Sequence, residues 1–476
     1  MTDTIETPTD ETIADDAVGF DAASVVAHVR DGFGQGLTRS IEWRRGQLDA
    51  MAAMLNDNAD ALRDALTADL HKPRTEGWTT EIGFTLADIV HQQKHLEKWA
   101  APRKVGIPVA FKPASARIVP EPKGVALIIA PWNYPLQLLL SPMAAAIAAG
   151  NAIVAKPSEL APATSALLTE LCNQYLDSST ITVVDGGVEV STALLEQRFD
   201  HIFFTGGTRI GKIVMRAAAQ HLTPVTRELG GKSPAIVAAD ADVEVTARRL
   251  AWGKFVNSGQ TCIAPDYVLV DPAVRDDLVA AIEAAVRSFY GDDAQQSPDY
   301  GRIISDNHWA RISGLLATSG GTIAFGGRTD AADRFIAPTV VVHPDLDSDL
   351  MTEEIFGPVL PVIAVDSVDD AIDFVNERDK PLALYAFTND DEVAQRIVRR
   401  TSSGGVSINA TLLHIGPPDL PFGGVGPSGV GAYHGQAGFD TFSHLKSVLD
   451  KRVKPDLKVM YPPYSKLKER LIRKLQ

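Results

Sequence analysis

The stretch Gly124-Val-Ala-Leu-Ile-Ile-Ala130 is the first of a series of short apolar runs that decide the fold. Similar runs follow at 152–155, 181–184 and 201–204, and a segment with helical periodicity separates each run from the next. Short apolar strands that alternate with helices are typical of parallel strands buried on both faces. We therefore predict that residues 124–229 form a doubly wound open sheet with right-handed connections.

A second series of the same kind begins after Gly230-Gly231. Its predicted strands cover 234–238, 268–270, 339–342 and 360–363, with helices at 243–255, 273–289 and 368–378. The two series together predict an α/β architecture of two doubly wound open sheets. Residues 100–116 contain prolines and an alternation of apolar side chains, so we predict an extended excursion or hairpin arm there.

Size, charge and cysteine content narrow the class of protein. A chain of 476 residues exceeds one ordinary core and predicts two or three domains. The formal net charge of −15 argues against nucleic acid as the main partner, because phosphate binding requires a basic surface. With only two cysteines, neither a disulfide framework nor a four-thiolate metal site is expected. We predict a cytoplasmic protein without a bound metal.

The two ends of the chain carry opposite charge. Residues 1–20 hold six acidic side chains and no basic one, so we predict a disordered acidic tail. Residues 451–476 hold nine basic and two acidic side chains, and the apolar residues after Ser465 recur at roughly helical spacing. This pattern favours a helix docked on the protein itself or on a neighbouring subunit. A membrane-surface contact by this basic tail is the alternative, which we do not favour.

The two cysteines have different surroundings. Cys172 lies in an amphipathic helical pattern and is interpreted as a buried core thiol. Cys262 lies in Ser258-Gly-Gln-Thr-Cys-Ile-Ala-Pro-Asp-Tyr267, where small polar residues precede it and Pro265 breaks any helix after it. Such a loop can offer the sulfur to a ligand. The local sequence alone leaves nucleophile and loop filler equally open.

Several polar residues follow the predicted strands of the first sheet. Ligands of open parallel sheets bind outside the carboxyl ends of the strands, so Asn133, Lys156–Glu159 and Gly206–Gly211 are expected to share one crevice. The glycine-rich segment lies between a strand and a helix, where helix N-termini can face phosphate, but it does not match G-x-G-x-x-G. Lys156 and Glu159 can hold ribose hydroxyls or form a solvated surface pair.

Three further residues have a chemical and a structural interpretation. Glu228 lies between an apolar strand and two glycines, where desolvation would raise its pKa into the range of a general base. It can equally be a strand-end acid paired with Arg227 or Lys232. The Asn133 amide can donate to an oxyanion or can simply form a turn. The local sequence around Glu354 indicates only an acidic residue in a loop.

Taken together, these pieces resemble the NAD(P)-dependent aldehyde dehydrogenase superfamily, and within it the class 3-like group that acts on fatty and aromatic aldehydes. The resemblance covers about residues 20 to 464. Its motifs are Pro131-Trp-Asn-Tyr-Pro135, Lys156-Pro-Ser-Glu159, Phe204-Thr-Gly-Gly-Thr208, Glu228-Leu-Gly-Gly-Lys-Ser-Pro234, Gly259-Gln-Thr-Cys262, Glu354-Ile-Phe-Gly-Pro358 and Leu420-Pro-Phe-Gly-Gly424. The class 3 character comes from Cys262-Ile-Ala-Pro-Asp-Tyr267, Gly431-Ala-Tyr-His-Gly435, Phe439-Asp-Thr-Phe-Ser-His444 and Tyr461-Pro-Pro-Tyr464.

The resemblance implies oxidation of an aldehyde to the carboxylic acid with NAD(P)⁺. The Cys262 thiolate would attack the aldehyde carbon to give a thiohemiacetal, and hydride loss would leave a thioester. The Asn133 amide and the backbone N–H of Cys262 would hold the oxyanion. Glu228 would activate the water that releases the acid. These three residues are the predicted catalytic set.

The resemblance also implies a Rossmann-like coenzyme site. In the family, positions equivalent to Lys156 and Glu159 meet the adenosine ribose, 206–211 lie by the pyrophosphate, and Glu354 with Phe356 positions the nicotinamide ribose. The full predicted coenzyme set is Trp132, Lys156, Glu159, Gly206, Gly207, Thr208, Arg209, Ile210, Gly211, Leu229, Glu354 and Phe356. The Glu159 carboxylate favours NAD because it repels a 2′-phosphate, with NADP as the alternative.

The family architecture implies the domain organisation and a homodimer. The predicted units are a coenzyme-binding domain (21–99 and 119–229), a catalytic domain (230–430), a small β oligomerisation arm (100–118 and 431–450) and a basic tail (451–476). Two other functions stay open: a dehydrogenase that passes the thioester to coenzyme A, against which Glu228 argues, and a non-catalytic binding or structural protein on the same scaffold. The sequence does not name the aldehyde.

Overall fold

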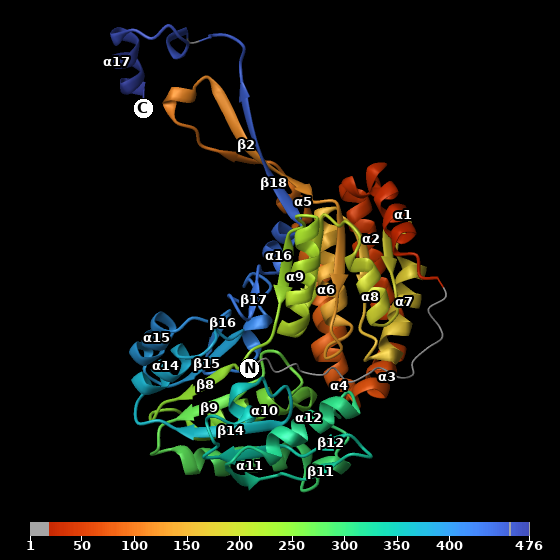
Figure 1. The fold of residues 1–476 in the computed structure, drawn as a ribbon, viewed down its shortest axis with the longest axis vertical. Coiled ribbons are helices and arrows are strands. Elements are labelled where there is room, and N and C mark those ends of the chain that lie inside the picture. The colour runs from red at the N-terminus through yellow and green to blue at the C-terminus, as the bar shows by residue number, and fades with distance from the viewer. Residues whose placement is uncertain (1–18, 457, 476) are drawn as a thin grey trace, which may run out of the picture.

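A computed structural model describes residues 19–456 and 458–475. Figure 1 shows two large α/β units, one above the other, and an arm that extends away from them. The predicted disordered tail at 1–20 falls outside the described residues except for Gly19 and Phe20. The predicted class, two open α/β sheets with a small β arm, is confirmed.

The first sheet contains the strands predicted from the apolar runs. Its order is β17-β7-β6-β3-β4-β5, and all neighbours are parallel except the short β17, which pairs antiparallel with β7. The strands are β3 (Val125–Ile129), β4 (Ala152–Lys156), β5 (Ile181–Val183), β6 (His201–Thr205), β7 (Val225–Glu228) and β17 (Gly429–Val430). The connecting helices are α6 (Gln137–Ala149), α7 (Pro162–Tyr175), α8 (Val188–Leu195) and α9 (Thr208–Gln220).

Helices from the N-terminal part of the chain cover this sheet. They are α1 (Ala22–Gly34), α2 (Ile41–Asp57), α3 (Ala59–Leu70), α4 (Arg74–Glu76) and α5 (Gly83–Ala100). Between α4 and α5 the chain forms one π-helical segment, η2 (Gly77–Ile82). The fully buried α6 packs against α2 and α5, so its apolar residues form the centre of the largest hydrophobic core.

The second sheet has seven strands in the order β10-β13-β14-β9-β8-β15-β16, with only β10 antiparallel. The strands are β8 (Pro234–Val237), β9 (Tyr267–Val270), β10 (Thr322–Phe325), β13 (Thr339–Val342), β14 (Val359–Ala364), β15 (Ala383–Phe387) and β16 (Gly405–Ile408). Its helices are α10 (Val243–Phe255), α11 (Arg275–Tyr290), α12 (Asp306–Ala317), α13 (Asp349–Thr352), α14 (Val368–Asn376) and α15 (Asp391–Arg400). A small hairpin joins β11 (Thr329–Asp330) to β12 (Phe335–Ile336).

The arm is a three-stranded antiparallel sheet. Its strands are β1 (Arg103–Val105), β2 (Ala114–Pro122) and β18 (Ser443–Lys451), and β2 lies in the middle. The segment 431–450, predicted as a whole to join the arm, divides in the structure. Its first part forms α16 (Gly435–Thr441) on α5 and α6, and only β18 belongs to the arm.

Beyond the arm lies α17 (Lys466–Leu475), which Figure 1 places at the end of the molecule. Leu467 and Leu471 on this helix are exposed in the single chain. Within the described part of the chain, no helix has both the length and the apolar character needed to cross a membrane.

Candidate active site

A cavity of about 240 Å³ lies where the two large sheets meet. Residues from both units line it: Pro131, Trp132, Asn133, Leu138, Thr205, Gly206, Gly207, Glu228, Leu229, Gly230, Cys262, His308, Arg311, Glu354, Phe356, Phe422 and Tyr433. The predicted catalytic residues Cys262, Glu228 and Asn133 are therefore brought together, although they are far apart in the chain. Parallel strands of the first sheet end at this edge, which is where open α/β sheets bind ligands.

Cys262 is presented by a loop with an unusual backbone. Asn257, Ser258 and Gly259 all have positive φ, at 51°, 52° and 75°. A Cβ at Gly259 would lie 2.3 Å from the carbonyl oxygen of Gly357, so only glycine fits this close approach. The loop turns back on itself, and it places the half-buried Cys262 between the central cavity and a second one.

The second cavity has a volume of about 230 Å³ and a mostly apolar lining. Its walls come from η2, α5, α6, α10, the cysteine loop and the segment after β16. They include Phe84, Leu138, Trp252, Val256, Ile263, Leu412, Leu413, Ile415 and Phe422. Cys262 lines both cavities. The sulfur can therefore be reached from an apolar side and from the side that carries the strand ends.

The thiol of Cys262 is held in its protonated form in this state of the protein. Burial raises its pKa to about 12, and the carboxylates of Glu354 and Glu228 add to the shift. A thiolate is the reactive nucleophile. For Cys262 to act as a nucleophile, a proton must therefore leave the sulfur before or during the attack.

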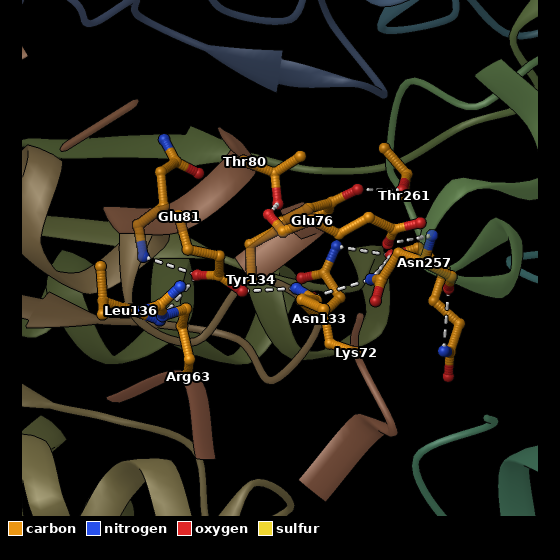
Figure 2. A network of polar contacts seen from close by, with 12 residues as sticks. Arg63, Lys72, Glu76, Thr80, Glu81, Asn133, Tyr134, Leu136, Asn257 and Thr261 are labelled. Carbon is orange, nitrogen blue, oxygen red and sulfur yellow. Dashed lines mark hydrogen bonds and ion pairs between the residues drawn. The ribbon is translucent and has the colours of Figure 1, made fainter. Parts of the chain in front are cut away.

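Asn133 sits in the turn between β3 and α6 and is almost fully buried. Its Nδ2 donates to the carbonyl oxygen of Gln260 at 3.0 Å, two residues before Cys262. Its own carbonyl oxygen accepts from the side chain of Asn257 at 2.8 Å and from Lys72 at 3.1 Å. The turn is thus bonded directly to the cysteine loop, as Figure 2 shows.

Glu228 ends β7 and is 3% exposed. Neither of its carboxyl oxygens has a hydrogen-bond partner among the described residues. Lys232, one of the two partners considered from the sequence, instead pairs with Asp266 and donates to the carbonyl oxygen of Glu353 at 2.7 Å. Burial raises the pKa of Glu228 well above its usual range. A buried carboxyl without a partner is costly for stability and typical of a functional group.

The predicted coenzyme residues fall into two groups. Trp132, Gly206, Gly207, Leu229, Glu354 and Phe356 line the central cavity, whereas Lys156, Glu159 and the first turn of α9 (Thr208, Arg209, Ile210, Gly211) do not. Lys156 ends β4, and its Nζ lies 2.9 Å from the carboxylate of Glu159. The start of α9 has no side-chain cap, so its backbone N–H groups are available to an anionic ligand.

Glu354 and the aromatic residues around it form one wall of the cavity. The Glu354 carboxylate lies against Gly230, where a Cβ would come within 2.1 Å of it. Phe356 has φ of 48°, and its ring meets the Trp132 ring edge-on at a centroid distance of 5.3 Å. Burial raises the pKa of Glu354 to about 7.

Sequence reasoning missed part of this wall. His308 packs on Trp132 with ring centroids 4.8 Å apart. Arg311 donates to the carbonyl oxygens of Glu354 at 3.1 Å and Ile355 at 2.6 Å. Both residues belong to α12, which has no counterpart in the predicted helices. The N-cap Ser305 and the helical spacing of Trp309, Ile312 and Leu315 are the local signal that could have located it. Tyr433 and Phe422, which also line the cavity, belonged to recognised motifs but were given no role there.

The chain belongs to the Aldehyde dehydrogenase family, whose profile matches residues 6–448. It is 47% identical over 443 residues to the dimeric NADP-preferring aldehyde dehydrogenase of Canis lupus familiaris. The aligned region covers 93% of this chain and 97% of that relative. It is 45% identical over 427 residues to 4,4'-diaponeurosporen-aldehyde dehydrogenase of Staphylococcus aureus (strain NCTC 8325 / PS 47), covering 90% and 93%. The substrate-bound state of Staphylococcus aureus AldH superposes with a TM-score of 0.93 at 43% identity over 96% and 99% of the two chains.

These comparisons confirm the predicted family and activity. The protein is an oxidoreductase that oxidises an aldehyde to the carboxylic acid with a nicotinamide coenzyme. They do not favour transfer of the acyl group to coenzyme A. A purely structural role on the same scaffold is likewise set aside.

The raised pKa of Glu354 predicts a pH-dependent stability difference. Its folded-state pKa of about 7 lies above the ordinary value of 4.5, so stability is fully present below pH 4.5 and is lost as the pH rises through about 7. Relative to Glu354→Gln, the coenzyme-free wild type should therefore lose stability over that window, by up to about 3 kcal/mol. Urea denaturation at pH 5 and pH 8 measures this, with the exposed Glu353→Gln as control. Equal pH dependence of wild type and Glu354→Gln would contradict the assignment.

Proposed function

We propose that Cys262 is the nucleophile of the aldehyde oxidation. Its position between the apolar cavity and the cavity at the strand ends is the observation that carries this proposal. An aldehyde entering from the apolar side would meet the sulfur from one direction, and a coenzyme in the crevice would meet the same carbon from the other. The other cysteine, Cys172, is fully buried in α7, and burial raises its pKa to about 12 without any group to activate it.

Asn133 is proposed to stabilise the negative oxygen of the tetrahedral intermediate. When Cys262 attacks, a new C–S bond forms and the carbonyl oxygen becomes an oxyanion. The Nδ2 of Asn133 lies beside the cysteine loop, with one of its two hydrogens engaged by Gln260 and the other free to donate. Together with the backbone N–H of Cys262, it supplies two donors of the kind used in oxyanion holes.

The crevice fits a dinucleotide by the chemistry of its donors. Uncapped N–H groups at the start of α9 suit a pyrophosphate, and the carboxylates of Glu159 and Glu354 suit ribose hydroxyls. A bound nicotinamide coenzyme would supply the hydride acceptor. We propose NAD as the preferred form, because the Glu159 carboxylate beside Lys156 repels a 2′-phosphate. NADP stays the alternative, and the canine relative is described as NADP-preferring.

Glu228 is proposed as the general base for thioester hydrolysis. Its unpaired carboxyl and its raised pKa suit a group that takes a proton from water at neutral pH. Water would add to the thioester carbon and the C–S bond would break. The carboxylic acid would be released, and the Cys262 thiolate would be regenerated as the leaving group. A water-activating base of this kind is required for hydrolysis and is unnecessary for transfer to coenzyme A.

The apolar cavity supports an aliphatic or aromatic aldehyde as substrate. Aromatic and branched side chains dominate its walls, and Trp252 and Leu413 are partly exposed there. Such a lining gains more from an apolar chain than from a small hydrated aldehyde.

We further propose a cytoplasmic homodimer. The arm supports an assembly through its exposed apolar side chains Val109, Phe111 and Leu449, and the name of the canine relative includes the word dimeric. Two free cysteines in a long chain support a reducing compartment. A membrane contact by the basic tail remains the less favoured proposal.

Cys262→Ala should abolish aldehyde-dependent formation of reduced coenzyme, because no sulfur remains to form the thiohemiacetal. Coenzyme binding, followed by quenching of tryptophan fluorescence, should persist. Cys172→Ala is the matched control and should keep its turnover. Full activity of Cys262→Ala would refute the assignment of the nucleophile.

Glu228→Gln should separate the two halves of the reaction. Stopped-flow absorbance should still show a first-turnover burst of reduced coenzyme, while the steady-state rate falls by about 100-fold or more because the amide cannot accept a proton from water. Loss of the burst together with the steady-state rate would assign Glu228 to an earlier step.

Comparison of kcat/KM across aldehydes and coenzymes tests the substrate and coenzyme proposals together. The apolar cavity predicts values that rise along a series of straight-chain aldehydes from two to ten carbons, and values for NAD that exceed those for NADP. Values that fall with chain length would reject the assignment of that cavity to the substrate. A preference for NADP would reject the role given to Glu159.

A further inference from the structure

The turn that carries Asn133 is held from outside both sheets by a buried ion pair. Lys72 and Glu81 come from the chain around α4 and η2, and both side chains have no exposed surface. No motif singled them out, and neither lines the two cavities at Cys262. Figure 2 shows them in the same network of contacts as Asn133 and Asn257.

Lys72 places its ammonium group directly beneath the turn. Its Nζ is hydrogen-bonded to the Glu81 carboxylate and donates to the carbonyl oxygen of Asn133 at 3.1 Å. The same nitrogen lies 4.2 Å from the centre of the Tyr134 ring, in a cation–π contact. Two of the three interactions of this ammonium group thus reach consecutive residues of the turn, and the third pairs it with Glu81.

Glu81 holds the other end of the same turn. Its second carboxylate oxygen accepts the backbone N–H groups of Leu136 at 3.1 Å and Gln137 at 3.0 Å. These are the first N–H groups of α6, which has no capping side chain of its own. A carboxylate from 55 residues earlier therefore acts as the N-cap of α6, where negative charge also suits the helix dipole. Glu81 lies in the π-helical segment η2.

The contacts continue from the turn to the cysteine loop. The carbonyl oxygen of Asn133, held by Lys72, also accepts from Asn257, whose Nδ2 lies 3.1 Å from the carbonyl oxygen of Gln260 as well. The Tyr134 hydroxyl lies 2.6 Å from the Thr261 hydroxyl. Residues 260 and 261 directly precede Cys262, so the position of the turn sets where the Asn133 amide stands relative to the sulfur.

We propose that the Lys72–Glu81 pair is the positioning element for Asn133 in the oxidation. This inference rests on the oxyanion role proposed above for Asn133. A buried ion pair contributes little net stability, because the desolvation of two charges offsets their attraction. A contribution to folding stability is therefore a poor explanation for the presence of this pair. Its hydrogen bonds run to the backbone on both sides of the turn, which is the arrangement needed to fix a donor to within a fraction of an ångström.

The test removes both charges at once, so that no lone charge is left in the interior. In Lys72→Met with Glu81→Gln, methionine keeps the length of the side chain and glutamine keeps an acceptor for α6. The first-turnover rate of reduced-coenzyme formation should fall by about 10- to 100-fold, because the amide is no longer held in place. The KM for coenzyme should stay unchanged. An unchanged first-turnover rate in the folded variant would overturn the proposal.

Arg44→Met is the matched control for loss of a buried cation. Arg44 lies on α2 and, like Lys72, donates to backbone carbonyl oxygens, among them that of Ala148 at 3.1 Å. Ala148 belongs to the opposite end of α6, far along the helix from Asn133. This variant should lose thermal stability and keep its first-turnover rate. An equal rate loss in Arg44→Met would show that any weakening of α6 slows the reaction, and would overturn the specific role of the pair.

A double-mutant cycle with Asn133→Ala decides whether the pair acts through Asn133. If it does, the variant with all three substitutions should have nearly the same first-turnover rate as Asn133→Ala alone. Additive losses would overturn the proposal. If the double variant does not fold, Lys72→Arg replaces it in the cycle, because a guanidinium keeps the charge but not the single-nitrogen geometry. Aldehyde oxidation by the wild type is measured in the same series. Absence of oxidation by the wild type would contradict the proposed function, whereas normal oxidation by both the wild type and the double variant would contradict only the positioning role.

Discussion

The hydrogen bond from the Asn133 side chain to the carbonyl oxygen of Gln260 joins the two large units beside Cys262. One partner belongs to the edge of the first sheet and the other to the loop that enters the second. Residues 257–259 all have positive φ, and Gln260, which follows them, directs its carbonyl oxygen at the Asn133 amide. Cys262 lies two residues after Gln260. The Lys72–Glu81 pair holds the opposite side of the same turn.

The electrostatics of the crevice follow from its burial. Glu228, Glu354 and Cys262 all have raised pKa values, because water is largely excluded and few partners replace it. The protonated forms of these three groups are therefore more favoured than they would be in water. Nearby, Lys232 and Asp266 form an ion pair with additional backbone bonds, which keeps their charges satisfied away from the sulfur. Glu228 is left without a hydrogen-bond partner among the described residues, at a cost in stability that the rest of the core offsets.

Much of the first unit could be predicted from the sequence because its strands are short, apolar and regularly spaced. The predicted runs at 152–155 and 201–204 begin where β4 and β6 begin, and in the second unit the predicted helix at 243–255 matches α10 at both ends. In the second unit β15 and α12 were not predicted, although both have a local pattern. Residues 382–387 form an apolar run like the other strands, and Ser305 caps a helix whose apolar residues recur at helical spacing. The motif residues were found because they recur together in a known family. The partners of Glu228 could not be predicted, because whether Lys232 turns to it or to Asp266 is decided by tertiary geometry.

The same reasoning explains why the support of the site was missed. Lys72 and Glu81 lie 61 and 55 residues from the positions they hold, and neither has a sequence neighbour that suggests the contact. Only the packing of the N-terminal helices on α6 brings them under the turn. Residues that touch the reacting atoms can be recognised from motifs, whereas residues that hold them in place become visible only in three dimensions.

Rapid acid quench during the first turnover tests most directly whether Cys262 carries the reaction. Wild-type protein mixed with coenzyme and an aliphatic aldehyde is quenched, digested and analysed by mass spectrometry. The peptide that contains Cys262 should gain the mass of the aldehyde less two hydrogens, which is the mass increase expected when the thiol becomes a thioester. Formation of reduced coenzyme in the same samples without this adduct on Cys262, or with the adduct on another residue, would contradict the account.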